Sequence, residues 1–136
     1  MDTGKSALGL DGNLAAALGY PIGIIAIICL IMEKENRFVK FHALQSILLH
    51  VAFIVVMIAV WILTIILVMA GLAASAASSS AGGAIGGIIS LLFGLIWLVI
   101  VVAYVGGLIF AAVKSYQGVQ FKLPVIGNMA DKFASK

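Results

Sequence analysis

No charged residue occurs between Phe41 and Val113, and this uncharged stretch constrains the fold more than any other feature of the sequence. It is too long for one helix across a bilayer, whose hydrocarbon core of about 30 Å is crossed by about 20 apolar residues. The chain of 136 residues is 64% hydrophobic and 10% charged, whereas a soluble domain has about 25% charged residues. A soluble fold of this size could not bury so much apolar surface. The sequence therefore predicts an all-α integral membrane protein with a single transmembrane domain over residues 1–136.

Three transmembrane helices are predicted from the uncharged runs. The first run extends from Leu14 to Met32, with Asn13 as a candidate N-cap and Glu33 at its end. The longer stretch is interrupted over residues 71–84 by a tract rich in Gly, Ala and Ser, which is typical of a turn at the membrane surface. We expect spans at about residues 14–32, 47–70 and 85–113, followed by a cytoplasmic tail over residues 114–136.

The basic residues predict an orientation. Seven of the eight fall in the loop after the first span or in the tail, and only Lys5 falls on the other side. Because Lys and Arg are enriched in cytoplasmic segments, we expect a cytoplasmic C-terminus and an N-terminus outside. Splitting the third span would separate the basic loop from the basic tail, and no charge or proline supports such a split. Six cations are expected to contact lipid headgroups: Lys34, Arg37, Lys40, Lys114, Lys122 and Lys132.

Small residues at four-residue spacing are candidates for helix packing, because helices in lipid associate through close contact of such residues. These contacts could join helices within one chain, which we favour, or helices of two protomers. Pro21, inside the first span, removes a backbone donor and is expected to kink that helix. The expected packing residues are Gly19, Gly23, Gly82, Gly86, Ser90 and Gly94.

A polar stripe is predicted at the start of the second span, where helical spacing places His42, Gln45, Ser46 and His50 on one face. Ionisable side chains inside a membrane mark candidate functional sites. The stripe could form a proton or solute pathway, or it could provide interfacial anchoring and interhelical hydrogen bonds, which is the interpretation we favour. A metal site is disfavoured, because His42 and His50 are more than two helical turns apart and cannot chelate one ion.

No enzyme motif is visible: there is no Gly-x-Ser-x-Gly elbow, HExxH pair or phosphate loop, and no carboxylate lies within a predicted span. We therefore expect no catalytic residue, no metal and no cofactor. The basic residues are scattered without interleaved aromatics, so no nucleic-acid partner is expected. After Pro124, the apolar Val125, Ile126, Met129 and Phe133 recur at helical spacing, which predicts a short amphipathic segment on the cytoplasmic leaflet or against the first loop.

Three parts of the sequence resemble a known family. Gly19-Tyr20 lies early in the first apolar run, residues 33–46 read EKENRFVKFHALQS, and residues 116–127 read YQGVQFKLPVIG. Together they resemble a family of small prokaryotic membrane proteins of unknown function, which is related to the small membrane subunit of the Tic translocon at the chloroplast inner envelope. The resemblance covers nearly the whole chain. The residues that match the family pattern are Arg37, Phe41, His42, Gln45, Pro124 and Gly127.

The resemblance implies an α-helical protein of a prokaryotic cytoplasmic membrane, and a channel or translocation component is among the roles it implies. The plastid relatives are four-helix proteins, whereas the charge pattern predicts three helices here. We expect a Tic-like structural or assembly module that oligomerises and does not catalyse a reaction. The alternative is a channel, transporter or translocation component lined by the polar stripe. The expected partners are membrane lipids, further copies of the chain and a membrane protein.

Overall fold

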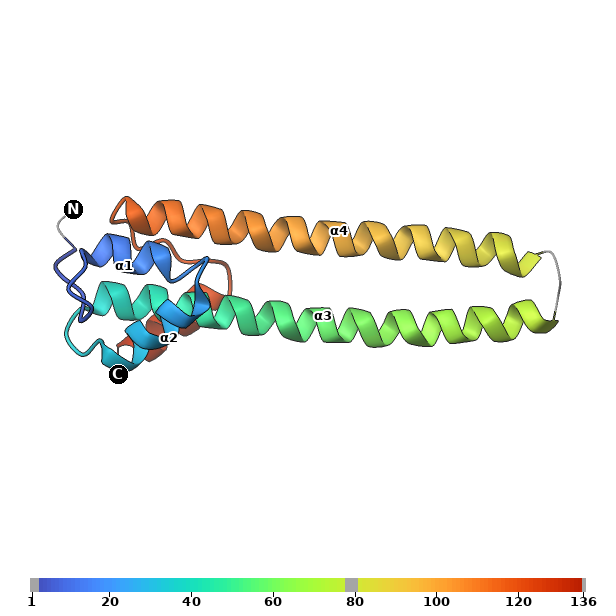
Figure 1. Cartoon of the computed structure of the whole chain (residues 1–136), viewed down its shortest axis with the longest axis horizontal. Coiled ribbons are helices and arrows are strands. Elements are labelled where there is room, and N and C mark those ends of the chain that lie inside the picture. Colours follow the sequence, from blue (N-terminus) through green and yellow to red (C-terminus); the bar gives the residue numbers. More distant parts are fainter. Residues whose placement is uncertain (1–2, 78–80, 136) are drawn as a thin grey trace. The chain divides into compact units, whose positions relative to one another are not determined.

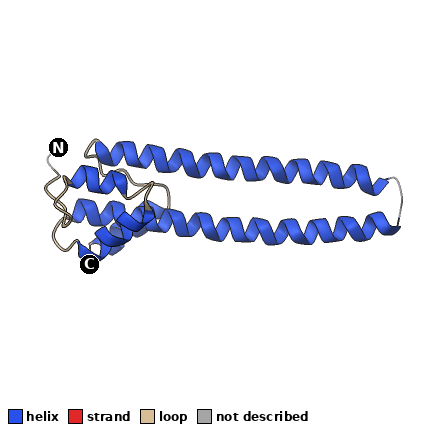
Figure 2. Cartoon of the chain, viewed as in Figure 1, coloured by secondary structure: helices blue, strands red, loops and turns tan. Residues whose placement is uncertain are grey.

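The computed structural model describes residues 3–77 and 81–135, and its regular structure in these residues is α-helix (Figure 1; Figure 2). This confirms the all-α prediction. The chain divides into two compact units, which we call the head unit (Met1–Ala52 with Val105–Lys136) and the hairpin unit (Phe53–Tyr104). The helices are α1 (Gly12–Leu18), α2 (Gly23–Met32), α3 (Arg37–Ala77), α4 (Ala81–Tyr116) and α5 (Ile126–Ala134).

Among the described residues, two helices rather than three are long and apolar enough to cross a membrane, over Arg37–Ala73 in α3 and Gly86–Tyr116 in α4. The prediction of three spanning helices is therefore wrong. Both helices also continue into the tract over residues 71–84 that was expected to form a turn. Ala is the best helix former, and the isolated Gly71 costs a helix only about 1 kcal/mol, so this composition did not stop α3. Residues 78–80, between the two helices, lie outside the described part of the chain.

The first apolar run does not form one helix, because it is divided into α1 and α2 by the residues between Leu18 and Gly23. At 1.5 Å per residue the two helices are about 10 Å and about 15 Å long, and each is shorter than the hydrocarbon core. Pro21 lies in the turn and is exposed, so it marks a break rather than the expected kink. The amide of Ile22 still bonds to the carbonyl of Leu18 at 3.1 Å, which keeps the turn tight.

The two short helices form an antiparallel hairpin against the first turns of α3 (Figure 1). Small side chains make the close contact: a Cβ on Gly19 would lie 3.4 Å from that of Ala26. One buried cluster joins α1, α2 and α3 through Ala15, Ala26, Cys29, Val39 and Ala43.

Glu33 fixes the end of this hairpin. The side chain is 6% exposed, and its carboxylate accepts hydrogen bonds from the amides of Ala7 at 2.7 Å and Asn36 at 3.1 Å. The side chain of Asn36 in turn accepts a bond from the Val39 amide and so caps the start of α3. The N-terminal segment, the loop after α2 and the first turn of α3 are therefore held together at one end of the head unit.

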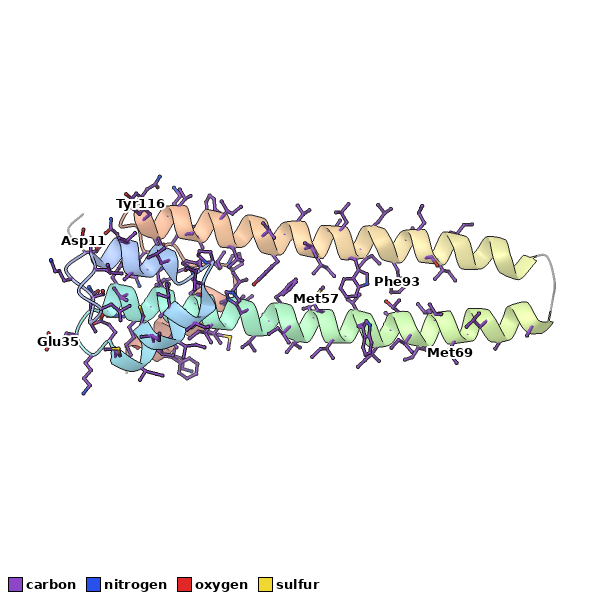
Figure 3. All side chains as sticks on the ribbon, viewed as in Figure 1. Asp11, Glu35, Met57, Met69, Phe93 and Tyr116 are labelled. Carbon is purple, nitrogen blue, oxygen red and sulfur yellow. The ribbon has the colours of Figure 1, made fainter. Side chains whose placement is uncertain are left out.

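The hairpin unit consists of the adjoining parts of α3 and α4. The rings of Phe53 and Tyr104 stack with centroids 3.8 Å apart, and Phe93 lies between the two helices (Figure 3). The hydroxyls of Thr64 and Ser90 donate to carbonyls one turn earlier in their own helices, at 2.7 Å and 2.9 Å. These bonds satisfy the hydroxyl groups within each helix, so the outer surface is chiefly aliphatic, as a lipid-facing helix pair requires.

Candidate functional site

The polar stripe of α3 lies at the centre of the head unit. His42, Gln45 and Ser46 are fully buried, and His50 is half-buried one turn further along. Helical geometry brings the four side chains to one face, and that face is covered by the turn between α1 and α2 and by the segment after α4. The structure therefore surrounds the stripe with protein.

Gln45 joins two segments that are far apart in the sequence. Its Nε2 donates to the hydroxyl of Tyr20 at 2.8 Å and to the carbonyl of Phe121 at 3.0 Å. Its Oε1 accepts a bond from the amide of Leu123 at 3.0 Å. The Leu123 amide can only donate, so it requires the amide oxygen of Gln45 on its side and sets the orientation of the group.

The hydroxyl of Tyr20 links Gln45 to His42 by hydrogen bonds. Since its oxygen accepts a bond from Gln45, its own hydrogen is available for Nδ1 of His42, which lies 2.9 Å away. The neutral imidazole then carries its proton on Nε2. Nε2 of His42 is buried and has no partner of good hydrogen-bond geometry in the described residues. The backbone of Val119 lies near the imidazole.

Aromatic rings enclose His42 on three sides. The ring centroids of Phe38, Phe41 and Tyr20 lie 4.5 Å, 5.0 Å and 5.9 Å away, all in edge-to-face arrangements. Such pairs are favourable and place apolar surface where a pathway would need water or polar groups. Within the parts of the chain that the structure describes, no group of three or more His, Cys, Asp or Glu side chains is close enough to hold a metal ion.

Ser46 and His50 complete the contact with the turn. The hydroxyl of Ser46 donates to the carbonyl of Gly19 at 2.8 Å, a group at the end of α1 that has no partner within its own helix. Nδ1 of His50 donates to the carbonyl of Ser46 at 2.8 Å, within α3. A Cβ on Gly23 would lie 3.7 Å from Nε2 of His50, so the start of α2 packs directly on the imidazole.

The segment after α4 returns to α3 and ends in α5, which packs on it. Ala130 and Ala134 of α5 cluster with Phe41, and Leu44 and Leu48 pack around them. Gly127 is required at the point of closest approach, because a Cβ there would lie 2.6 Å from Cα of Lys122 and 2.8 Å from Oε1 of Gln45. The predicted amphipathic segment is thus docked on α3 through its small residues.

Val125 forms a strained turn just before α5. Its φ of 64° and ψ of −59° are rare for a β-branched residue. The Ile126 amide bonds to the carbonyl of Pro124 at 2.7 Å, which closes a three-residue γ-turn of the strained kind. The turn brings α5 into contact with α3 immediately after Leu123 has bonded to Gln45.

An ionic cluster at the surface adds to this docking. The carboxylate of Asp131 lies 2.8 Å from Nζ of Lys122 and 3.4 Å from a guanidinium nitrogen of Arg37. The hydrogen bond from Lys122, together with the charges of Lys122 and Arg37, lowers the pKa of Asp131 below its usual value. Arg37 and Lys122 are exposed and Asp131 is half-buried, so the cluster contributes little to stability beyond orientation.

Comparison with known proteins places this fold among small membrane proteins. A model of the magnetosome magnetite crystal formation protein family matches residues 7–130, which is most of the chain. The chain belongs to this family. The match contains all of α1 to α4 and the network around Gln45.

Relatives of this family member occur in archaea. A UPF0132 membrane protein of Methanocaldococcus jannaschii is 37% identical over 132 residues, covering 96% of each chain. A UPF0132 membrane protein of Archaeoglobus fulgidus is 34% identical and covers 88% of this chain and 92% of its own. A second M. jannaschii protein of that name is 30% identical and covers 93% of this chain and 73% of its own. These names support the membrane prediction, and no solved structure matches the chain.

The structure separates the expected packing residues of this family member into two groups. Gly19 and Gly23 contact Ala26 and His50 within the head unit. A Cβ on Gly86 or Gly94 would meet nothing within 4 Å, and Ser90 bonds to the carbonyl of Gly86. Gly82 lies in α4, but its surroundings fall outside the described side chains.

The six cations expected at lipid headgroups have different surroundings in the structure. Lys122 and Arg37 pair with Asp131, and Lys114 is half-buried at the end of α4. The remaining three are exposed or half-buried on α3, α5 and the loop before α3: Lys34, Lys40 and Lys132.

Several partners of the stripe, above all Tyr20, were not predicted from the sequence. This residue is fully buried and links Gln45 to His42, yet it entered the sequence analysis only through the family resemblance. A hydroxyl within a long apolar run was the available signal, because a buried Tyr usually needs a hydrogen-bond partner. The backbone groups of Phe121 and Leu123 gave no such signal, since every residue carries them.

Proposed function

We propose that the chain is a structural or assembly module of a prokaryotic cytoplasmic membrane, without catalytic activity. One observation carries the proposal: the polar stripe bonds to the chain itself. Gln45 makes three hydrogen bonds to the α1–α2 turn and to residues 121–123, and Ser46 bonds to the turn. Side chains engaged in this way favour packing over conduction, so the stripe supports a structural role more than a channel or transporter.

We further propose that both termini lie on the cytoplasmic side. Two spanning helices return the chain to the side from which it started, in place of the opposite sides expected from three spans. All eight Lys and Arg residues then lie on one side, because none falls between Phe41 and Val113. This is a stronger charge asymmetry than the three-span arrangement had, and it is the asymmetry typical of cytoplasmic segments.

In this arrangement the α1–α2 hairpin is re-entrant: it enters the membrane and leaves on the same side. Irregular backbone at membrane depth needs partners from the protein, and Ser46 supplies one to the carbonyl of Gly19. The outer face of α2 suits lipid contact, since Ile24 and Ile31 are 69% and 72% exposed.

Oligomerisation is proposed through the small-residue face of α4. The directions that a Cβ would take from Gly86 and Gly94 are open, and the intervening Ser90 has turned its hydroxyl to its own backbone. Such a face allows close approach of a second helix in lipid. A further copy of the chain is therefore the partner we propose, with membrane lipids around it.

The family description refers to magnetite crystal formation. For this chain we propose the coarser role of organising a membrane surface. The relation to the small Tic subunit, and a role beside another membrane protein, remain expectations from the sequence resemblance alone.

Cysteine labelling tests the proposed arrangement of two spanning helices with both termini on the cytoplasmic side. In a Cys29→Ala background, Lys5→Cys and Ser135→Cys should both react with an impermeant reagent only from the cytoplasmic face, and Ser79→Cys only from the opposite face. Reaction of Lys5→Cys and Ser135→Cys from opposite faces would refute the two-span arrangement.

Native mass spectrometry from lipid discs tests the oligomer. Gly86→Ile and Gly94→Ile should shift the protein to monomer, because the larger side chains block close approach. The matched control is Gly71→Ile on α3, where a Cβ likewise meets nothing within 4 Å. An unchanged oligomer in both α4 variants, or a monomeric wild type, would contradict this interface.

A further inference from the structure

We propose that the head unit binds a phosphate group in a pocket between its N-terminal segment and the start of α3. The pocket has a volume of about 640 Å³, within the range of about 300–1,000 Å³ typical of ligand sites. It is lined by residues 3–7 of the N-terminal segment and by residues 32–37, which join the end of α2 to the first residue of α3. Three cations are among the lining residues: Lys5, Lys34 and Arg37.

Hydrogen bonds between the two segments hold the walls of the pocket in place. The carboxylate of Glu33 accepts bonds from the amides of Ala7 and Asn36. Nδ2 of Asn36 donates to the carbonyls of Thr3 at 2.7 Å and Lys5 at 3.3 Å. All five residues line the pocket. A ligand therefore meets walls that are already in position, which lowers the entropic cost of binding.

The same bonds occupy hydrogen-bond acceptors of the walls. Both carboxylate oxygens of Glu33 and the two carbonyls bonded to Asn36 accept hydrogen bonds, and the carbonyl of Gly4 accepts one from the amide of Gly12 at 2.7 Å. The ammonium and guanidinium groups of the three cations can only donate. The pocket thus offers donors and positive charge to a ligand, which favours an anion over a cation.

The charge of the three cations is only partly compensated. In the described part of the chain the carboxylate that forms ion pairs is that of Asp131, which contacts Arg37 but neither of the other two cations. That contact, at 3.4 Å, engages one guanidinium nitrogen and leaves further donors of Arg37 for a ligand. The lining carboxylates are Glu33, which is turned to two amides, and Glu35, which is exposed (Figure 3). The positive end of the α3 dipole at Arg37 adds to the attraction for an anion.

A phosphate group matches these donors better than a carboxylate, because its larger number of oxygens can serve several cations at once. Arg37 lies four residues before the uncharged stretch that begins at Phe41, about 6 Å along α3. The phosphate can therefore belong to a soluble anion or to the headgroup of a phospholipid. The pocket itself is independent of the proposed function, and only the headgroup as a source rests on the membrane placement proposed above.

Amide NMR spectra of the full chain in maltoside micelles and phosphate-free buffer test the site. Inorganic phosphate is titrated in one arm, and phosphatidic acid is added to the micelles in the other. We expect saturable shifts of the amides of residues 3–7 and 32–37. Saturation by inorganic phosphate identifies a soluble ligand, and saturation by phosphatidic acid alone identifies a headgroup. The absence of saturable shifts in both arms would overturn the proposal.

Charge variants test which residues hold the phosphate. Lys5→Gln and Lys34→Gln should each weaken binding about fivefold, the equivalent of about 1 kcal/mol for one cation. Glu35→Gln should tighten binding, because it removes a carboxylate that repels the anion. The matched control is Lys132→Gln, which removes an exposed cation of α5 outside the pocket and should leave binding unchanged. Equal weakening by Lys132→Gln and the two pocket variants would overturn the site.

The labelling experiment separates this site from the proposed function. If the labelling pattern at Lys5 and Ser135 is as expected while neither arm saturates, the phosphate site fails and the proposed function stands. If inorganic phosphate saturates the site while the two positions are labelled from opposite faces, the site stands and the two-span arrangement fails.

Discussion

Nε2 of Gln45 donates a hydrogen bond of 2.8 Å to the hydroxyl of Tyr20, and this contact joins α3 to the turn between α1 and α2. The same amide holds the backbone of Phe121 and Leu123. One side chain thus connects all three parts of the sequence that carry the family resemblance, the last of which follows the hairpin unit.

Gln45→Leu should destabilise the head unit by about 2–5 kcal/mol, because it leaves the Leu123 amide and the Phe121 carbonyl without their side-chain partner and removes one of the two hydrogen bonds of the Tyr20 hydroxyl. The free energy of unfolding in mixed micelles measures the effect. The matched control is Thr64→Val in the same helix, whose hydroxyl bonds only to its own helix. A loss from Gln45→Leu no larger than that from Thr64→Val would show that the three bonds do not hold the head unit together.

Gly127→Ala should displace α5 from α3, since the added methyl would lie 2.6 Å from Cα of Lys122. Overpacking of this kind costs about 1–3 kcal/mol, and we expect faster hydrogen exchange throughout Ile126–Ala134. Gly106→Ala is the control, because a Cβ there meets nothing within 4 Å and alanine favours helix. Equal exchange in α5 of the two variants would contradict the tight approach at Gly127.

Acid should loosen α5 through Asp131. Its pKa in the folded state lies below the usual value of 3.8, chiefly because of the hydrogen bond from Lys122. A lowered pKa means that the stabilisation is complete above the usual value and is lost as the pH falls through the folded-state pKa. NMR titration of the α5 amides should show this transition, and Asp131→Asn should abolish it. A transition that persists in Asp131→Asn would assign the loosening to another group.

Val125→Gly should stabilise the docked C-terminal segment by up to about 1 kcal/mol, because glycine adopts a φ of 64° without strain while it loses more backbone entropy on folding. Val125 is 73% exposed, so little packing is lost. Thermal denaturation followed by circular dichroism measures the difference. Val119→Gly is the control at an exposed residue with ordinary φ and should destabilise. Similar losses in both variants would argue against strain at Val125.

The all-α fold, the long helices and the grouping of His42, Gln45 and Ser46 on one face follow from hydrophobicity and helical period, which act locally. The division of the first apolar run into α1 and α2 does not follow from these local properties. Leu14 to Met32 has the length and composition of a span, and the turn within it is joined to α3 by the hydrogen bond from the Ser46 hydroxyl to the Gly19 carbonyl. That bond is a tertiary contact, and hydropathy carries no information about it.

The same limit explains the role of residues 116–127. The apolar pattern after Pro124 predicted an amphipathic segment on the cytoplasmic leaflet or against the first loop, but it did not indicate that the Leu123 amide would bond to Gln45 or that Gly127 would lie against that side chain. Glycine is uninformative in a hydrophobicity profile. Gly127 matters here because it has no Cβ, which would clash with Lys122 and Gln45.

The bonds of Gln45 also impose an order on biogenesis. The α1–α2 segment is synthesised first, and until α3 follows it the carbonyl of Gly19 and the hydroxyl of Tyr20 lack the partners that they have in the finished protein. The Leu123 amide reaches Gln45 only after α4 has been made. The α1–α2 turn therefore has its partners as soon as α3 has been made, whereas Gln45 completes its bonds only near the end of translation, and a protein truncated before residue 121 would leave it without the Phe121 and Leu123 backbone.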